Sequence, residues 1–140
     1  MTEETTELRL PSRIDAIDEA AIAVAKFVSR SGIDEQAAFG IDMAVREAIA
    51  NAVIHGNKLD QEKSVTISLA SSPDSLEIKV RDQGQGFSPD GISDPTAEEN
   101  ILKSSGRGIF FMRNFMDEVD WVALPDGGTS VRMLKRIANS

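Results

Sequence analysis

Three polar side chains that could do chemistry recur at intervals of four residues in one short segment. Residues 47–57 read EAIANAVIHGN and contain Glu47, Asn51 and His55. In a helix, this spacing places a carboxylate, an amide and an imidazole on one face, each one turn from the next. The neighbouring positions form a broad apolar stripe, which comprises Ile41, Ala44, Val45, Ala48, Ile49, Ala52 and Val53. The segment therefore predicts a helix with a buried apolar side and a line of reactive groups along its edge.

The same side chains could instead belong to the solvated face of an ordinary amphipathic helix. Asn51 argues against this, because asparagine in the middle of a helix competes for backbone hydrogen bonds and is disfavoured there. An ordinary surface pair exists elsewhere on this helix, where Asp42 and Arg46 have the spacing of a helix-supporting ion pair. Both interpretations of the segment stay open on this spacing alone.

Two short glycine segments follow further along the chain. The first is Asp82–Phe87, DQGQGF, and the second is Gly106–Gly108, GRG. Glycine lets a ligand approach the backbone closely, and the second segment opens a predicted helix, whose free N–H groups attract a phosphate. Each segment alone could equally be a turn or a helix entry. Neither is a Walker loop or a Rossmann fingerprint, because the flanking residues of both motifs are missing.

The composition excludes several classes of function. The chain has 140 residues, a net charge of −8, no cysteine and one histidine. Disulfides, thiolate metal sites and histidine-rich metal sites are therefore excluded, and direct nucleic-acid binding is disfavoured by the negative charge. The N-terminus is acidic and no apolar run is long enough to span a membrane, so we expect no membrane association and a cytoplasmic protein.

The hydrophobic periodicity predicts one domain, residues 1–140, of the α+β class. A strand over residues 6–10 precedes a helix that begins at a capping box, Ser12-x-x-Asp15, and ends at Gly32. A second helix runs from Asp34 to about Gly56. The remaining predicted elements are strands at 64–70 and 76–81, a mobile loop at 88–105, a helix at 109–119, and strands at 120–124 and 129–137. We expect a two-layer α/β sandwich with helices on one face of a mixed, mostly antiparallel sheet.

The ordered set of motifs resembles the GHKL ATPase superfamily, which has the Bergerat nucleotide-binding fold. The segment Glu47–Asn57 is similar to its N-box, and the two glycine segments are similar to its glycine boxes. The runs NAVIHGN and FMRNFMDEVD especially resemble the serine-kinase branch, the anti-sigma factors of bacterial partner switching. The histidine-kinase branch fits less well, because its ATPase domains are normally tethered to a dimerisation domain.

The resemblance implies roles for individual residues with ATP and Mg²⁺ as the cofactors. Asn51 would ligate Mg²⁺, and Glu47 would be the general base that takes the proton from a serine hydroxyl. Asp82 would accept a hydrogen bond from the adenine amino group, supported by Thr129. The other residues expected around the nucleotide are His55, Asn57, Gly84, Gly86, Phe87, Ser105, Gly106, Arg107, Gly108 and Ile109.

The cation that stabilises the transferred phosphoryl group is less clearly assigned. Kinases of this branch can carry an arginine two residues before the second glycine box, and here that position is Ser104. The nearest cations are Lys103 and Arg107, and we name Arg107 as the catalytic candidate.

The resemblance further implies an ATP-dependent protein serine kinase that acts as an anti-sigma factor. Such a protein would phosphorylate a STAS-domain anti-anti-sigma partner, sequester a sigma factor and form a homodimer. Its partner-binding surface would include the first helix and the area around the loop at 88–105, which would form the lid over the nucleotide. The alternative is a non-catalytic binding switch in which ATP changes the affinity for a protein partner without phosphoryl transfer.

Overall fold

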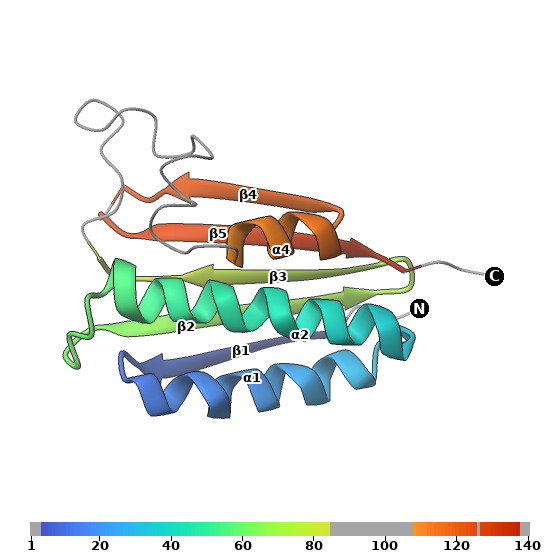
Figure 1. Cartoon of the computed structure of the whole chain (residues 1–140), viewed down its shortest axis with the longest axis horizontal. Helices are drawn as coiled ribbons and strands as arrows, with labels where there is room; N and C mark the ends of the chain where they lie inside the picture. The colour runs from blue at the N-terminus through green and yellow to red at the C-terminus, as the bar shows by residue number, and fades with distance from the viewer. Residues whose placement is uncertain (1–3, 85–107, 126, 138–140) are drawn as a thin grey trace.

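The described part of the protein folds as two layers, with helices on one face of a five-stranded sheet (Figure 1). The computed structural model describes residues 4–84, 108–125 and 127–137. The helices are α1 (Ile14–Ser29), α2 (Glu35–Ala50) and α4 (Gly108–Phe115), and a short π-helical turn, η1 (Asn51–Gly56), extends α2. The strands are β1 (Glu4–Pro11), β2 (Ser64–Ser72), β3 (Ser75–Arg81), β4 (Glu118–Ala123) and β5 (Thr129–Arg136). The predicted α+β sandwich is confirmed.

The sheet has the strand order β1-β2-β3-β5-β4. The sequence predicts a mixed, mostly antiparallel sheet. All four pairings between the described strands are antiparallel, so none of these pairs is parallel. Alternate residues point to the helices, and register pairs such as Ile67 with Val80 and Leu69 with Ile78 are buried. The apolar residues that alternate along these strands therefore form the sheet side of the hydrophobic core.

The opposite face of the sheet is held together by charged side chains. Arg132 of β5 donates to Glu77 of β3 at 2.6 Å and to Glu118 and Asp120 of β4 at 3.1 Å each. This network crosses three strands on the side that the helices leave uncovered.

The boundaries of α1 and α2 follow the predicted signals in part. Gly32 has a φ of +86°, which suits glycine after a helix, and the Asp34 side chain accepts the Ala37 N–H at 2.8 Å as a cap. The predicted capping box at Ser12 is wrong. α1 begins after Arg13 without a side-chain cap, because the Ser12 hydroxyl instead donates to the Lys63 carbonyl at 2.9 Å.

The third predicted helix is shorter than its pattern indicates. α4 ends at Phe115, whereas the periodicity extended to Val119. The chain leaves the helix because the Asp117 N–H donates to the Leu134 carbonyl at 2.8 Å, which starts the pairing of β4 with β5. Tertiary pairing therefore overrides a local helical pattern over residues 116–119.

The last turn of the long second helix is wound more widely than an α-helix. In η1 the Asn57 N–H donates to the carbonyl of Ala52, five residues earlier, at 2.8 Å. Lys58 and Leu59 then take left-handed conformations with φ of 54° and 60°, and the Leu59 N–H returns to the Val53 carbonyl. Such π turns are rare and occur often at functional sites, and this one lies in the segment that the sequence singled out.

Candidate functional site

Glu47 and Asn51 lie one helical turn apart at the end of α2. Both side chains are half-buried, while the flanking Ala48, Ile49, Ala52 and Val53 are buried in the core. Burial raises the pKa of Glu47, and the hydrogen bond from Asn51 partly opposes that shift. The prediction that these two polar groups share one edge of a buried helix is confirmed.

His55 takes a different position from the other two members of the predicted line. It lies in η1 and is exposed, as is its neighbour Ile54. The half-burial of Glu47 and Asn51 therefore does not continue to the third position of the line.

The Asp82 carboxylate lies at the end of β3 and is only 8% exposed. Its Oδ1 accepts the N–H of Gly84 at 3.0 Å and the N–H of Thr129 at 3.1 Å, and the Asp82 N–H donates to the Thr129 carbonyl at 2.9 Å. Burial raises the pKa of Asp82, while these backbone donors and the charge of Lys63 act in the opposite direction. Both of these donors reach Oδ1, and the other oxygen, Oδ2, lies on the side of Gly56.

Three glycines allow the segments around Asp82 to approach one another. A Cβ on Gly56 would lie 2.6 Å from the Asp82 carboxyl carbon, and a Cβ on Gly84 would lie 2.6 Å from the carbonyl carbon of Gly56. A Cβ on Gly128 would collide with the Asp82 carbonyl oxygen. These contacts bring η1, the first glycine segment and the start of β5 together around one carboxylate.

Asn57 is 1% exposed and uses its whole side-chain amide inside the protein. Its Nδ2 donates to the Ser12 hydroxyl at 2.7 Å and to the Ser64 carbonyl at 3.0 Å, while its Oδ1 accepts the Gln83 N–H at 2.7 Å. Both amide hydrogens are thereby used, and none is left for a nucleotide. The geometry makes Asn57 a residue that positions the site.

Several predicted site residues lie outside the part of the chain that the structure describes. These are Gly86, Phe87, Ser105, Gly106 and Arg107, together with the predicted loop at 88–105. Gly108 is the first residue of α4 and Ile109 follows it in the helix, as the second glycine segment predicts. Thr129 is placed beside Asp82 through its main chain, as described above.

The described residues include no group of three or more His, Asp or Glu side chains that could hold a metal ion. Mg²⁺ in nucleotide sites keeps water and binds phosphate oxygens, with one or a few oxygen ligands from the protein. Asn51 suits this role because its amide nitrogen must be the donor to Glu47, a carboxylate that accepts only. The Asn51 oxygen then remains available, and it is a hard neutral ligand.

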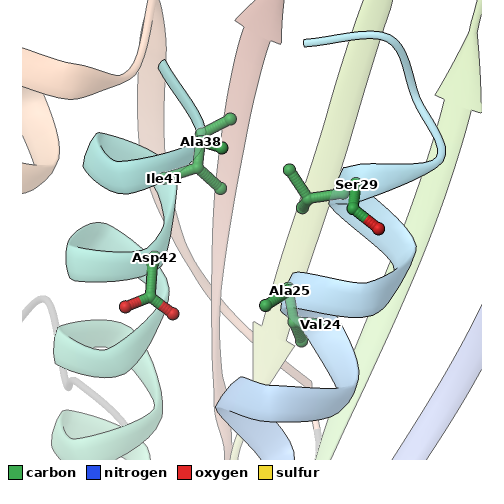
Figure 2. A pocket seen from close by; sticks show the side chains of 7 residues that line it. Val24, Ala25, Ser29, Ala38, Ile41 and Asp42 are labelled. Atoms are coloured by element: carbon green, nitrogen blue, oxygen red, sulfur yellow. The ribbon is translucent and has the colours of Figure 1, made fainter. Parts of the chain in front are cut away.

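A separate groove lies between α1 and α2. Figure 2 shows that Val24, Ala25 and Ser29 of α1 face Ala38, Ile41 and Asp42 of α2 across it, and Val28 completes its lining. None of these is a predicted nucleotide-site residue. No helix among the described residues is long and apolar enough to cross a membrane.

Sequence reasoning missed several residues that build the site. The sequence pattern predicts a helix cap at Ser12, assigns no role to Gln83 within its glycine motif, and marks Gly56 only as the end of a helix. Gly128 was part of a hairpin turn. A signal exists for Gly56, because it lies within the N-box segment Glu47–Asn57; the other contacts join segments that are distant in the sequence.

Comparisons with known proteins agree with this arrangement. Residues 10–135 match the family model of the histidine kinase-like ATPase domain. The chain is 33% identical over 123 residues to the anti-sigma F factor of Oceanobacillus iheyensis, with 86% of this chain and 84% of that protein covered. It is 32% identical, with the same coverage, to the anti-sigma F factor of Bacillus cytotoxicus.

Solved structures with low sequence identity share the fold. The RsbU and RsbW domains of a Mycobacterium tuberculosis protein match with a TM-score of 0.70 at 18% identity, over 98% of this chain and 33% of that one. The SiaB-SiaC complex from Pseudomonas aeruginosa matches with a TM-score of 0.66 at 13% identity, over 92% of this chain and 88% of that one. By these matches the chain belongs to the histidine kinase-like ATPase family, in the anti-sigma factor branch of the GHKL superfamily.

Proposed function

We propose that this protein is an ATP-dependent protein serine kinase that acts as an anti-sigma factor. The observation that carries the proposal is the half-buried Glu47 carboxylate one helical turn from Asn51, with burial raising the pKa of Glu47. A nucleotide-binding domain without phosphotransfer has no need of a desolvated base beside its metal ligand. The names of the anti-sigma F factor relatives support the regulatory part of the proposal.

Asp82 would recognise the base of the nucleotide. Its Oδ1 is held by two backbone N–H groups, so Oδ2 would accept a hydrogen from the adenine amino group. Guanine carries an oxygen at that position, and two acceptors would then face each other. The glycines that pack against Asp82 keep this carboxylate in place.

Asn51 would ligate Mg²⁺, which when bound neutralises charge on the ATP phosphates. Glu47 would accept the proton of a serine hydroxyl on the partner protein. The serine oxygen forms a bond to the γ-phosphorus, the bond from that phosphorus to the β–γ bridging oxygen breaks, and ADP leaves. The raised pKa of Glu47 brings this base closer to neutral pH, which suits general-base catalysis.

The protein substrate would be a STAS-domain anti-anti-sigma factor. When that partner is phosphorylated, the kinase would be free to hold a sigma factor, and transcription would be regulated in this way. A homodimer in the cytoplasm is part of the same proposal, since the sigma factor acts there. These assignments rest on the resemblance to the family and on the names of its relatives.

The proposal is tested by intact-mass spectrometry of the host's STAS-domain proteins after incubation with this protein and Mg-ATP. One added phosphoryl group on a single STAS protein is expected. Glu47→Gln should abolish the addition and keep ATP binding, whereas Glu35→Gln, an exposed position on the same helix, should keep both. No addition on any STAS protein, with ATP binding confirmed, would favour the ATP-gated binding switch.

A further inference from the structure

A polar network that runs from the buried Ser12 and Asn57 to the exposed Gln83 holds the segment that carries Asp82. It contains Ser12 before α1, Asn57 after η1, Ser64 at the start of β2, and Gln83 in the first glycine segment. Ser12 and Asn57 are 0% and 1% exposed. Buried polar groups whose hydrogen bonds are all made give a unique local arrangement, since any displacement leaves a desolvated group unpaired.

Three of these residues form a closed ring of hydrogen bonds. The Asn57 amide donates to the Ser64 carbonyl at 3.0 Å, the Ser64 N–H donates to Gln83 Oε1 at 2.7 Å, and the Gln83 N–H donates to Asn57 Oδ1 at 2.7 Å. A ring of this kind fixes the relative position of all its members, because no member can move without breaking two bonds.

The ring holds the backbone on which Asp82 depends. The N–H groups of three consecutive residues have three different acceptors: Asp82 reaches the Thr129 carbonyl, Gln83 reaches Asn57, and Gly84 reaches the Asp82 carboxylate. Only the middle N–H is held by a side chain from another segment. Removing the Asn57 side chain would take away the acceptor of the Gln83 N–H. Gln83 lies between Asp82 and Gly84, whose backbone positions orient the Asp82 carboxylate.

We propose that Asn57 is a positioning residue for base selection: through the Gln83 N–H it fixes the direction of the Asp82 carboxylate, and so sets the preference for a base with an exocyclic amino group. The inference rests on the proposed role of Asp82 in adenine recognition. Asn57 acts through Gln83 and makes no contact with the base itself.

The experiment compares the Kd of ATP with the Kd of inosine triphosphate, which has an oxygen in place of the adenine amino group. The wild-type protein should bind ATP at least about tenfold more tightly, because one charge-assisted hydrogen bond distinguishes the two. Asn57→Ala should reduce this ratio to about two or less. Val28→Ala, which removes buried volume from α1, is the matched control: it lowers the melting temperature and should leave the ratio unchanged.

Different results overturn different parts of the reasoning. A wild-type protein that binds both nucleotides equally would contradict adenine recognition by Asp82, and with it the proposed function. A preserved ratio in folded Asn57→Ala would overturn the positioning role alone. If Asn57→Ala does not fold, Ser12→Ala provides the test: it removes one partner of the Asn57 amide and should lower the ratio by a smaller factor, and an unchanged ratio would again overturn the inference.

Discussion

Replacing Gly56 by alanine should damage the candidate site through a single methyl group. The added Cβ would lie 2.6 Å from the Asp82 carboxyl carbon and closer still to its Oδ2. Asp82 cannot simply turn away, because its Oδ1 is held by the N–H groups of Gly84 and Thr129. Overpacking of this kind costs about 1–3 kcal/mol. Since each kcal/mol lowers the melting temperature of a domain of this size by about 3 °C, we expect a decrease of about 3–9 °C.

The same methyl group should weaken nucleotide binding. A displaced Asp82 loses a charge-assisted hydrogen bond to adenine, which corresponds to an affinity loss of about tenfold to a hundredfold. Isothermal titration calorimetry with Mg-ATP measures the affinity, and differential scanning fluorimetry measures the melting temperature.

A control separates this effect from the general cost of adding a side chain to glycine. Gly32 has a φ of +86° and no heavy atom within 4 Å of an added Cβ. Gly32→Ala should cost about 1 kcal/mol through its backbone conformation and leave ATP affinity unchanged. If Gly56→Ala binds ATP as the wild type does and melts at the same temperature, the close packing of η1 on Asp82 is refuted.

Four further substitutions test the proposed roles. Glu47→Gln should slow phosphotransfer by at least about 100-fold. The raised pKa means that Glu47 binds its proton more tightly in the folded protein than in the unfolded one, so the free energy of unfolding of the wild type should fall as the pH rises through that pKa. The melting temperature of Glu47→Gln should therefore decrease less over the same pH range. Asp82→Asn should weaken ATP binding by about tenfold to a hundredfold. In the wild-type protein, the affinity for ATP should fall as the pH is lowered through the raised pKa of Asp82. Titration calorimetry at several pH values measures both effects. Arg132→Ala should cost about 1 kcal/mol in urea unfolding without changing ATP affinity, since its partners lie on the uncovered sheet face. Arg107→Ala should slow single-turnover transfer more than it weakens ATP binding, and an unchanged rate would remove Arg107 from the mechanism.

The parts of the fold that could be predicted are those with a repeating local signal. Apolar and polar residues alternate along β2 and β3, and apolar residues form a stripe along α2. Only one orientation of each element buries its apolar residues, so the buried face of each strand and helix follows from the sequence. The Asp34 cap was also predictable, because its acceptor and donor lie three residues apart. The pairing of Glu47 with Asn51 belongs to the same class, since one helical turn connects them.

The parts that could not be predicted depend on contacts between distant segments. Ser12 has the pattern of a capping residue, but its hydroxyl is the partner of Asn57, which is 45 residues away. The end of α4 is set by pairing with β5. The π turn forms where the Asn57 N–H donates to the carbonyl of Ala52, five residues earlier. The ring of hydrogen bonds with Ser64 and Gln83 holds Asn57 in that position. No local propensity encodes these partners.

The π turn explains how one helix serves two segments of the site. Up to Asn51 the α-helical winding keeps Glu47 and Asn51 one turn apart and in contact. Beyond it the wider winding, followed by the left-handed Lys58 and Leu59, brings Gly56 against Asp82 and turns the Asn57 amide into the interior. In a regular α-helix the Asn57 N–H would donate to the Val53 carbonyl, whereas here it donates to Ala52, and Val53 accepts the Leu59 N–H instead. The departure from α-helical geometry is therefore what joins the proposed catalytic pair to the proposed base-recognition carboxylate in a single site.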